Sequence, residues 1–503
     1  MNSRDLLDNV VCVVYEVLFT SLRLPYYLTK LNMPPSGVTK GYQRTLSNTR
    51  LQHDDSIDLS FGTIMAGANP TLLKAKFSRP KDTLLDKIIP KFVSKHVRNM
   101  CHELQAASPD SAVTLEPSAT ESFAAVVMVD VSQYSKLTAT LAERGSVGVG
   151  LLSATMKGYF DQIIEIINNH GGDVVKFAGD ALVFCWKSKD LTEITDPSGD
   201  VSRGNLVYKA SRCCLQLLTD LGTYAVDIKD CDTKLLKIHL GIGAGIVFDV
   251  VVGGGRQQRW EHFIAGEGAS QLSQVLDLAK AGELALSHQA LKWLTFIIDI
   301  RTLNLGNYDK RCIILTGLEK AEKKCEPPVI VEPSITYDLP GQLAGNLDLN
   351  KKFMDRTALF KLQDDLHQSM LFGMDVSLKE LLGLSELRQV TTIFIKIGSL
   401  QVVHRGTLLD ESQRAISIVL NALDKCEGNL RQFHVDDKGA VILCFFGLPP
   451  MAHENDAMLG IQAGIEIQKG FKEIFDNFSI GITTGVLSFG GVGTKDRAEY
   501  AVV

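Results

Sequence analysis

The stretch Phe-Ala-Ala-Val-Val-Met-Val-Asp-Val-Ser-Gln-Tyr-Ser, residues 123–135, decides the fold of this chain. Its segment Ala124–Val129 is short and continuously apolar, which predicts a buried β-strand, and the segment ends abruptly at Asp130. Apolar side chains then recur at helical spacing over residues 151–167, and Gly171-Gly172 is expected to end that helix. The stretch therefore opens an α/β unit whose first strand ends on a carboxylate.

Further elements follow this helix. Residues 174–177 and 181–186 predict two strands joined by the tight turn Ala178-Gly179-Asp180. A helix is expected over 206–221, and then a strand over 235–242 with a glycine-rich hairpin that runs to Gly255. Strand, helix, hairpin, helix and strand is the order of a ferredoxin-like domain, in which helices cover one face of an antiparallel sheet.

The same order returns later in the chain. Strands are expected over 390–395, 430–435 and 440–446, and helices over 416–423 and 458–475. The segment Gly-Ile-Gly-Ala-Gly-Ile-Val at 241–247 is echoed by Gly-Ile-Thr-Thr-Gly-Val-Leu at 481–487. We therefore predict an α/β (α+β) chain with two tandem ferredoxin-like domains. Its predicted parts are an N-terminal extension of unknown role (1–118), a first domain (119–310), a linker (311–384) and a second domain (385–503).

The composition is that of an ordinary globular protein, since 45% of the 503 residues are hydrophobic and 22% are charged. A net charge of −6 argues against a nucleic-acid partner, which would require clustered Lys and Arg. The ten cysteines form no CxxC pair, as expected of reduced cytosolic thiols. No apolar run reaches the ~20 residues of a membrane span; the nearest, Val10–Leu24, predicts an amphipathic helix. The sequence thus predicts a cytoplasmic protein without a transmembrane segment.

Two carboxylates are the candidate chemical groups of the first unit. If the 174–186 hairpin pairs beside the first strand, Asp130 and Asp180 reach the same end of the sheet. Carboxylates held together repel each other unless a divalent cation neutralises them, and such hard oxygen ligands suit Mg²⁺ or Mn²⁺ bound with phosphate. The alternative is that Asp130 only caps its strand and Asp180 is an ordinary turn residue.

The segments 123–135 and 171–182, with Asp130 and Asp180, resemble the two metal motifs of class III nucleotidyl cyclases. Within that family, the chain is most similar to the bicarbonate-responsive soluble adenylyl cyclases of animals, which have two tandem cyclase domains. The resemblance covers about residues 120–300 and 385–503, and it includes the entry Ser385–Arg388 of the second copy. It implies two cyclase domains that pair within one chain.

The resemblance implies an adenylate cyclase that converts ATP to cyclic AMP and pyrophosphate with two Mg²⁺ or Mn²⁺ ions. Asp130 and Asp180 would hold both ions, and the Val131 carbonyl would be a further ligand. Lys237 would contact phosphate, although a solvated strand residue is the alternative. The backbone amides that would cradle the phosphates belong to Ser132, Gln133, Tyr134 and Ser135.

Several positions depart from the family pattern. The second copy has Lys396 where the first has Asp130, so only one of the two pseudo-symmetric sites is expected to bind metal. The adenine-reading positions hold Gln432 and Ala501 in place of Lys and Thr. Lys176 aligns with a lysine that helps to bind a regulatory anion, bicarbonate, but Ser273 replaces the arginine that accompanies it.

A catalytic Asn and Arg of the family lie beyond the segment that matches 499–503, where this sequence stops. The corresponding positions of the first copy hold Ser270 and Gln274, which cannot replace them. The chain is therefore expected to be a fragment of a longer protein or a weak or inactive cyclase. The second functional hypothesis is a cyclase-fold module that binds nucleotide or partners without turnover.

Overall fold

The computed structural model describes residues 10–12, 88–108, 113–188, 197–226, 234–299, 301, 303–308, 312–318, 347–371, 385–398, 400, 404–436, 439–494 and 496–502. All of them belong to one compact unit, formed by residues 1–19 and 86–503. Residues 10–12 form a strand, β1 (Val10–Cys12), which pairs in parallel with a strand of the second domain. The helix expected over Val10–Leu24 is therefore wrong at its start, and its remainder lies outside the described residues.

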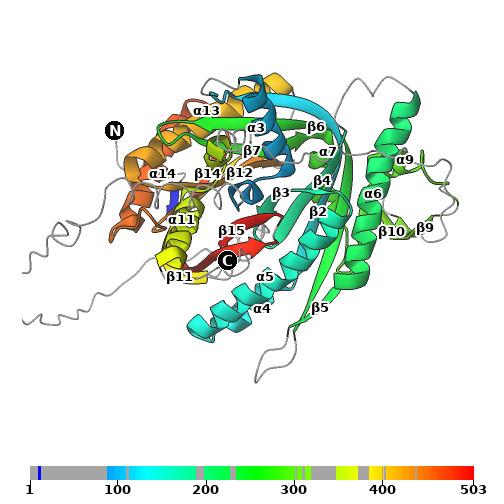
Figure 1. Ribbon diagram of the computed structural model, residues 1–503, viewed down its shortest axis with the longest axis horizontal. Coiled ribbons are helices and arrows are strands. Elements are labelled where there is room, and N and C mark those ends of the chain that lie inside the picture. Colours follow the sequence, from blue (N-terminus) through cyan, green and yellow to red (C-terminus); the bar gives the residue numbers. More distant parts are fainter. Residues whose placement is uncertain are drawn as a thin grey trace, which may run out of the picture. The chain divides into compact units, whose positions relative to one another are not determined.

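The first sheet is built around a long strand, β2 (Ser118–Ser132), which lies between β4 and β6 (Figure 1). Its order is β3 (Asp173–Ala178), β4 (Ala181–Lys187), β2, β6 (Lys234–Gly254), β8 (Leu284–Ser287), β10 (Cys312–Gly317) and β9 (Asn304–Tyr308). Two more strands, β5 (Thr223–Val226) and β7 (Arg259–Gly266), also pair with β6. The helices α5 (Gly145–Asn169) and α6 (Pro197–Leu221) pack on one face of this sheet.

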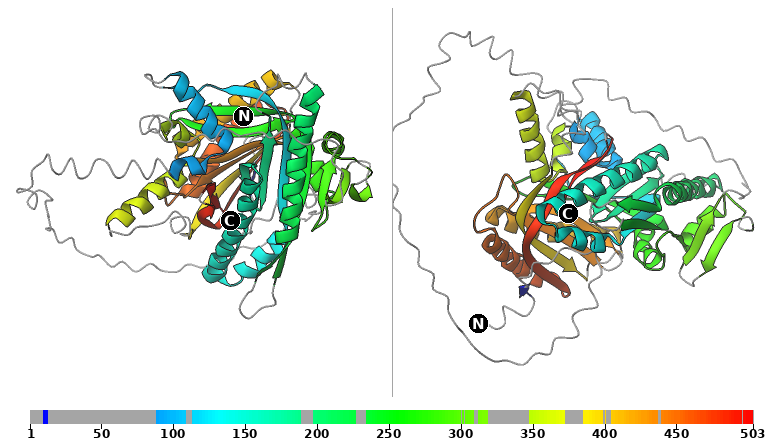
Figure 2. Two further views of the ribbon diagram at one scale, coloured as in Figure 1. Left: turned by 45° about the vertical axis from the view of Figure 1, so that its right-hand side comes forward. Right: turned by 90° about the horizontal axis from the view of Figure 1, so that it is seen from below.

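The second sheet repeats this arrangement. Its order is β1, β14 (Phe478–Gly493), β11 (Ser385–Ile397), β13 (Gly439–Phe446) and β12 (Asn429–Asp436), with β15 (Ala498–Val502) paired to β14. The helices α13 (Arg405–Cys426) and α14 (Asp456–Lys472) lie side by side against it (Figure 2). The predicted mixed α/β architecture with a repeated ferredoxin-like order is confirmed.

The strand registers show which positions of the two copies are equivalent. In the first copy Asp130 of β2 lies opposite His239 of β6, and in the second copy Lys396 of β11 lies opposite Ser479 of β14. Two residues earlier on β2 and β11, Met128 faces Gly241 and Phe394 faces Gly481. The two glycine-rich segments are therefore structural equivalents, as their sequences predict.

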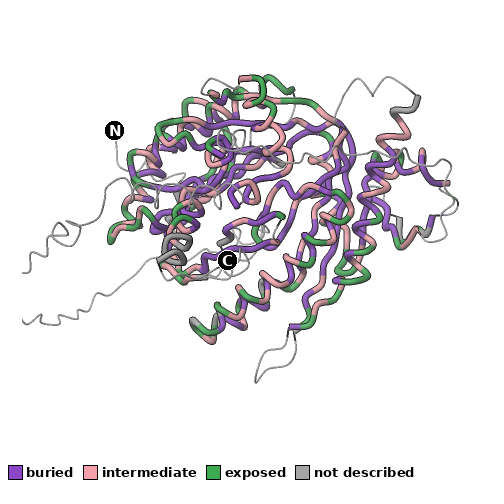
Figure 3. The backbone as a smooth tube through the Cα atoms, in the orientation of Figure 1, coloured by how far each residue is buried: buried purple, intermediate pink, exposed green. Residues whose placement is uncertain are grey.

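Alternation along β2 separates the core from the candidate site. The odd-numbered residues from Phe123 to Val131 pack into the helix-covered core, whereas the even-numbered ones from Ala124 onward line the opposite face. Figure 3 shows buried backbone through the strands and exposed backbone along the outer sides of the helices. Asp130 belongs to the even-numbered series, so its carboxylate leaves the sheet on the face away from α5 and α6.

The glycine-rich hairpin expected before Gly255 is wrong in position. β6 continues without a break to Gly254, and its turn to β7 lies at residues 255–258. The glycines at 241 and 243 serve close packing instead: a Cβ on Gly243 would lie 2.2 Å from the carbonyl oxygen of Gly268. Gly268 belongs to the short helix α7 (Glu267–Ser270), which lies directly on β6.

We expect Gly243→Ala to lower the free energy of unfolding by about 2 kcal/mol or more, because backbone atoms cannot move aside as a side chain can. The matched control is Gly485→Ala in the second copy, where no atom lies within 4 Å of the added Cβ. Urea denaturation of both variants measures the difference. Equal stabilities would show that α7 does not hold this position against β6.

The predicted domain boundaries differ from the observed elements. The first sheet continues past residue 310, because β10 pairs with both β8 and β9. Upstream of residue 118, η1 (Ile89–Phe92) and α3 (Lys95–Ala107) pack in the same compact unit as both sheets. Two similar hydrogen bonds link the sheets to each other's helices: Gly253 N donates to Gln413 of α13, and Gly493 N donates to Asp161 of α5.

Candidate functional site

The two predicted carboxylates meet at one end of the first sheet. Asp130 lies opposite Ala181 in the β2–β4 ladder, so it is beside Asp180 in the β3–β4 turn. Gly179, with φ of +68°, provides the left-handed residue that this tight turn requires. Burial, and secondly the charge of Asp130, raise the pKa of Asp180 to about 7. The pair therefore costs free energy when both carboxylates are ionised, and a cation would remove that cost.

The donor set fits a hard divalent cation. Two carboxylates, together with a backbone carbonyl such as that of Val131, the residue after Asp130 on β2, are the kind of oxygen ligands that Mg²⁺ and Mn²⁺ accept along with phosphate oxygens. Asp130 is half-buried and Asp180 is buried. The pair is therefore largely removed from solvent, but Asp130 stays accessible to it. The arrangement is able to hold a metal–phosphate complex at the end of β2.

A histidine that the sequence analysis did not select belongs to this site. His239 is buried on β6, and its Nε2 lies 3.3 Å from Oδ2 of Asp130. Its Nδ1 lies 3.0 Å from Oγ of Ser132. His239 could have been found from the sequence, because it lies two residues after the candidate Lys237 on the same strand, and residues two apart on a strand share a face.

The predicted phosphate turn follows directly. Gln133 has φ of +70°, a left-handed conformation that turns the chain from β2 into α4 (Tyr134–Ala142). The N-terminus of α4 thereby lies next to Asp130, and free amides at a helix N-terminus attract anions. The Tyr134 side chain is buried, so only its backbone is suited to this role. The side chain of Ser135 lies outside the described set.

Lys237 lies opposite Ser132 in the β2–β6 ladder and is half-buried. It is two residues from His239, so it points to the same face of the sheet as the carboxylate site. This position is compatible with the predicted phosphate contact.

The second copy lacks these groups at its equivalent end. Lys396, the counterpart of Asp130, is exposed. The base-reading candidates lie on two other strands of the second sheet: Gln432 is buried on β12, and Ala501 of β15 pairs with Gly490. The metal residues and the base-reading candidates thus come from different sheets.

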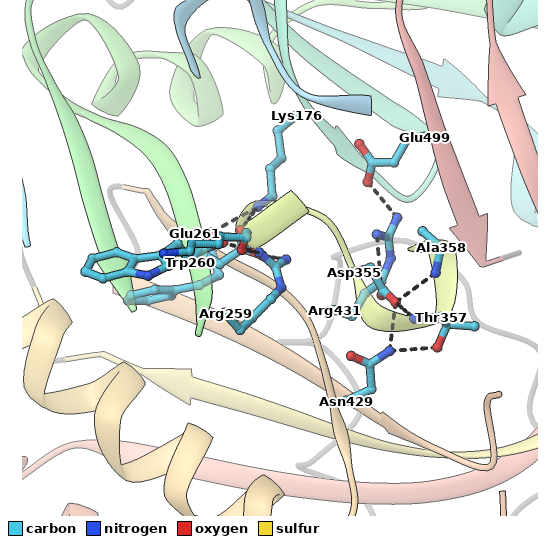
Figure 4. A network of polar contacts seen from close by, with 12 residues as sticks. Lys176, Arg259, Trp260, Glu261, Asp355, Thr357, Ala358, Asn429, Arg431 and Glu499 are labelled. Carbon is cyan, nitrogen blue, oxygen red and sulfur yellow. Dashed lines mark hydrogen bonds and ion pairs between the residues drawn. The ribbon is translucent and has the colours of Figure 1, made fainter. Parts of the chain in front are cut away.

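Lys176 of β3, the predicted anion-binding residue, already has an anionic partner. Its Nζ donates to Oε2 of Glu261 at 2.6 Å and to the carbonyl of Phe433 in the second sheet at 3.3 Å. Arg259 contacts the other carboxylate oxygen of Glu261 (Figure 4). Although burial opposes its ionisation, Lys176 and Arg259 hold the pKa of Glu261 below its usual range. An external anion would have to compete with this buried carboxylate.

A matching pair lies in the second sheet (Figure 4). Arg431 of β12 donates to Glu499 of β15 at 2.6 Å, and Arg497 lies 3.3 Å from the same carboxylate. The cavity between the two pairs has a volume of about 70 Å³ and is lined by Lys176, Arg259, Glu261, Arg431, Arg497 and Glu499, among others. That volume admits a few water molecules or a small ion.

A third polar cluster, His96, Asp249 and His262, has three possible metal-ligating atoms within 4.8 Å. Asp249 lies opposite Thr120 and Asp130 opposite His239, so the cluster is about 30 Å further along the β2–β6 ladder at ~3.3 Å per residue. Lys187 contacts the Asp249 carboxylate and supplies the positive charge there. The cluster is thus an internally neutralised contact, separate from the Asp130 site.

The same cluster attaches α3 to the first domain. The His96 ring stacks on His262 with centroids 4.8 Å apart, and burial lowers the pKa of His96 to about 3, so it is neutral. The backbone amides of Lys95 and His96 donate to the Asp173 carboxylate at 2.8 and 3.0 Å. On the other side, Phe92 stacks on Tyr500 of β15. Residues 88–107 therefore contact both sheets.

Comparison with known proteins identifies one kind of curated relative. The chain is 24% identical over 404 residues to adenylate cyclase type 10 of Oryctolagus cuniculus, a match that covers 75% of this chain and 23% of the rabbit protein. The human protein of that name is 24% identical over 370 residues, or 68% of this chain and 21% of its own length. The chain thus spans less than a quarter of these relatives. No protein-family model matches.

Two solved structures align with this chain at low sequence identity. A class III adenylyl cyclase-like ATP-binding protein from Pseudomonas aeruginosa aligns with a TM-score of 0.46 and 14% identity, covering 81% of this chain and 86% of that one. A bacterial light-regulated adenylyl cyclase aligns with a TM-score of 0.34 and 16% identity, covering 57% of this chain and 71% of that one.

Among the described helices, none is both long and apolar enough to cross a membrane.

The resemblance to class III nucleotidyl cyclases, expected from the Asp130 and Asp180 motifs, is thus confirmed by sequence comparison. This chain resembles the adenylate cyclases type 10 of mammals, across 75% of its length for the rabbit protein and 68% for the human one.

Proposed function

We propose that this chain is an adenylate cyclase region that converts ATP to cyclic AMP and pyrophosphate. The observation that supports this most is the adjacent pair Asp130 and Asp180, whose mutual repulsion a divalent cation would relieve. The relatives named adenylate cyclase type 10 point to the same reaction. Two Mg²⁺ or Mn²⁺ ions, when bound, would acidify the ribose 3′-hydroxyl and neutralise the triphosphate.

In this proposal each candidate site residue has a distinct role. Asp130, Asp180 and the Val131 carbonyl hold the cations, and the amides of residues 132–135 orient the triphosphate at the start of α4. Lys237 neutralises phosphate charge from β6. Gln432 and Ala501 contact the adenine, and Lys176 is the point at which a regulatory anion would compete with Glu261.

The proposal requires that the two sheets pair within one chain, because the metal ligands belong to the first and the base-reading residues to the second. The inter-sheet hydrogen bonds from Lys176 to Phe433 and from Arg497 to Val174 support such pairing. We also propose that the enzyme acts in the cytoplasm, in keeping with its cysteine pattern.

A nucleotide-binding module without turnover is the second candidate function. It is favoured by Ser270 and Gln274, which stand where cyclases of this family have Asn and Arg. Ser270 Oγ donates a hydrogen bond to the carbonyl of Glu267 in its own helix. This contact does not direct the hydroxyl towards the Asp130 site. Such a module would bind ATP with Mn²⁺ and release it unchanged.

The test is to incubate the purified chain with Mn²⁺ and either ATP or GTP and to identify the cyclic product by mass spectrometry. We expect cyclic AMP from the wild type and at least a 100-fold loss in Asp130→Asn, because the amide keeps the shape but loses the charge that binds the cation. Lys396→Gln, at the equivalent position of the second copy, is the matched control and should keep its activity. Binding of ATP without any cyclic product would favour the second candidate.

A further inference from the structure

His239 connects two residues of the candidate site to each other. Its Nε2 lies 3.3 Å from Asp130 Oδ2 and its Nδ1 lies 3.0 Å from Ser132 Oγ. An ionised carboxylate can only accept hydrogen bonds, so the proton of the neutral ring belongs on Nε2. Nδ1 then accepts from the Ser132 hydroxyl. The Asp130 carboxylate thus selects the Nε2–H tautomer, and the Ser132 hydroxyl, which can donate to Nδ1, holds the ring from its other side.

The strand register makes this arrangement rigid. Asp130 and His239 are directly opposed in the antiparallel β2–β6 ladder, and Ser132 is opposite Lys237, one step along the same face. Directly opposed residues have Cβ atoms ~5 Å apart, which brings an imidazole and a carboxylate into contact without any loop. His239 is also buried, so the ring has little freedom to turn away.

The second copy offers a comparison within the same chain. By the register of β11 with β14, the positions of Asp130, Ser132 and His239 are occupied by Lys396, Gly398 and Ser479. The second copy therefore has neither the carboxylate nor the imidazole, and its hydroxyl, on Ser479, stands at the position of the histidine and not at that of Ser132. The three residues behave as one set, which is expected if the histidine and serine serve the carboxylate.

We propose that His239 is a positioning residue for metal binding, held by Ser132, that orients the Asp130 carboxylate through its Nε2–H. This inference rests on the proposed function, because it concerns the cation that Asp130 would hold. The imidazole donor restrains Oδ2 of Asp130 from the β6 side, while Asp180 lies beside the same carboxylate on the β4 side. Hydrogen bonds of this kind to a metal ligand typically change metal affinity 10–100-fold.

The test measures Mn²⁺ affinity directly, by the electron paramagnetic resonance of free Mn²⁺ during titration of the ATP-free protein. We expect His239→Ala and His239→Asn to bind Mn²⁺ at least 10-fold more weakly than the wild type. His239→Gln should stay within about threefold, because its amide nitrogen occupies the place of Nε2, whereas the amide of asparagine occupies that of Nδ1. Circular dichroism and thermal melting report whether each variant is folded.

The outcomes separate this inference from the proposed function. Failure of the wild type to bind Mn²⁺ would overturn the metal site and the proposed function with it. Wild-type binding with unchanged affinity in His239→Ala, or with equal losses in the Gln and Asn variants, would overturn the positioning role alone. If the alanine variant does not fold, the comparison of Gln with Asn decides the question.

Discussion

Asp180→Asn is expected to stabilise the metal-free chain and, at the same time, to abolish its stabilisation by Mn²⁺. Asp180 is buried beside Asp130, and its pKa is raised from 3.8 to about 7. At about 1.4 kcal/mol per pKa unit, ionising it costs up to ~4 kcal/mol of folding free energy at neutral pH. The amide removes that cost together with the charge that attracts the cation.

The pH dependence has a defined sign. Because the folded-state pKa of Asp180 is higher than the unfolded value, the folded chain binds more protons between pH 4 and 7. The contribution of Asp180 to stability in EDTA therefore falls as the pH rises through this window, and it is unfavourable above pH 7. Asp180→Asn should remove this fall.

Thermal melting in EDTA and in Mn²⁺, from pH 4 to 8, measures both effects. Asp220→Asn, a change at an exposed carboxylate of α6, is the control and should leave both curves unchanged. A lower melting temperature of Asp180→Asn in EDTA would contradict the idea that ionising Asp180 beside Asp130 destabilises the metal-free chain.

Glu261→Ala is expected to cost about 3–5 kcal/mol of stability, the loss typical when one partner of a buried ion pair is removed. Glu261 is buried against Lys176 and Arg259, and both cations would be left without their carboxylate. Lys176 also donates to Phe433, so the loss should extend to the contact between the two sheets.

Urea denaturation measures this loss, and two further variants make the result interpretable. Asp348→Asn breaks the exposed pair with Lys351 and should cost less than about 1 kcal/mol. The double variant Glu261→Met with Lys176→Met should recover part of the loss, because one unpaired cation is removed with the carboxylate. A cost below 1 kcal/mol for Glu261→Ala would mean that water solvates the two cations well enough for them not to need the Glu261 carboxylate.

The element order was predictable because it depends on local patterns. A continuous apolar run, such as Ala124–Val129, predicts a buried strand. Apolar residues at helical spacing, as over 151–167, predict a helix with one buried face. The glycine-rich segment from Gly241 was misjudged for the same reason. Glycine permits both a turn and close packing, and only the approach of Gly268 to Gly243 shows which of the two applies.

The kind of chemistry at the candidate site could also be predicted from the sequence. Asp130 lies on β2 and Asp180 lies in the β3–β4 turn, and the two meet because β4 pairs with β2. This long-range pairing was expected from the ferredoxin-like order of the elements. Their residue types already indicated a hard cation. In the same way, Lys396 in the second copy indicated that only one of the two equivalent strand ends has a candidate metal-binding carboxylate.

The partners of those residues depend on contacts between segments far apart in sequence. His239 reaches Asp130 only through the β2–β6 register, and Lys176 meets Glu261 only because β7 returns beside β3. Such pairings are set by how whole strands align and by which charges must be neutralised on burial, and neither appears in any local pattern. Residue types and their order along the chain thus determined the kind of fold and the carboxylate pair, whereas long-range packing decided which side chains hold that pair in place and which charges are already satisfied.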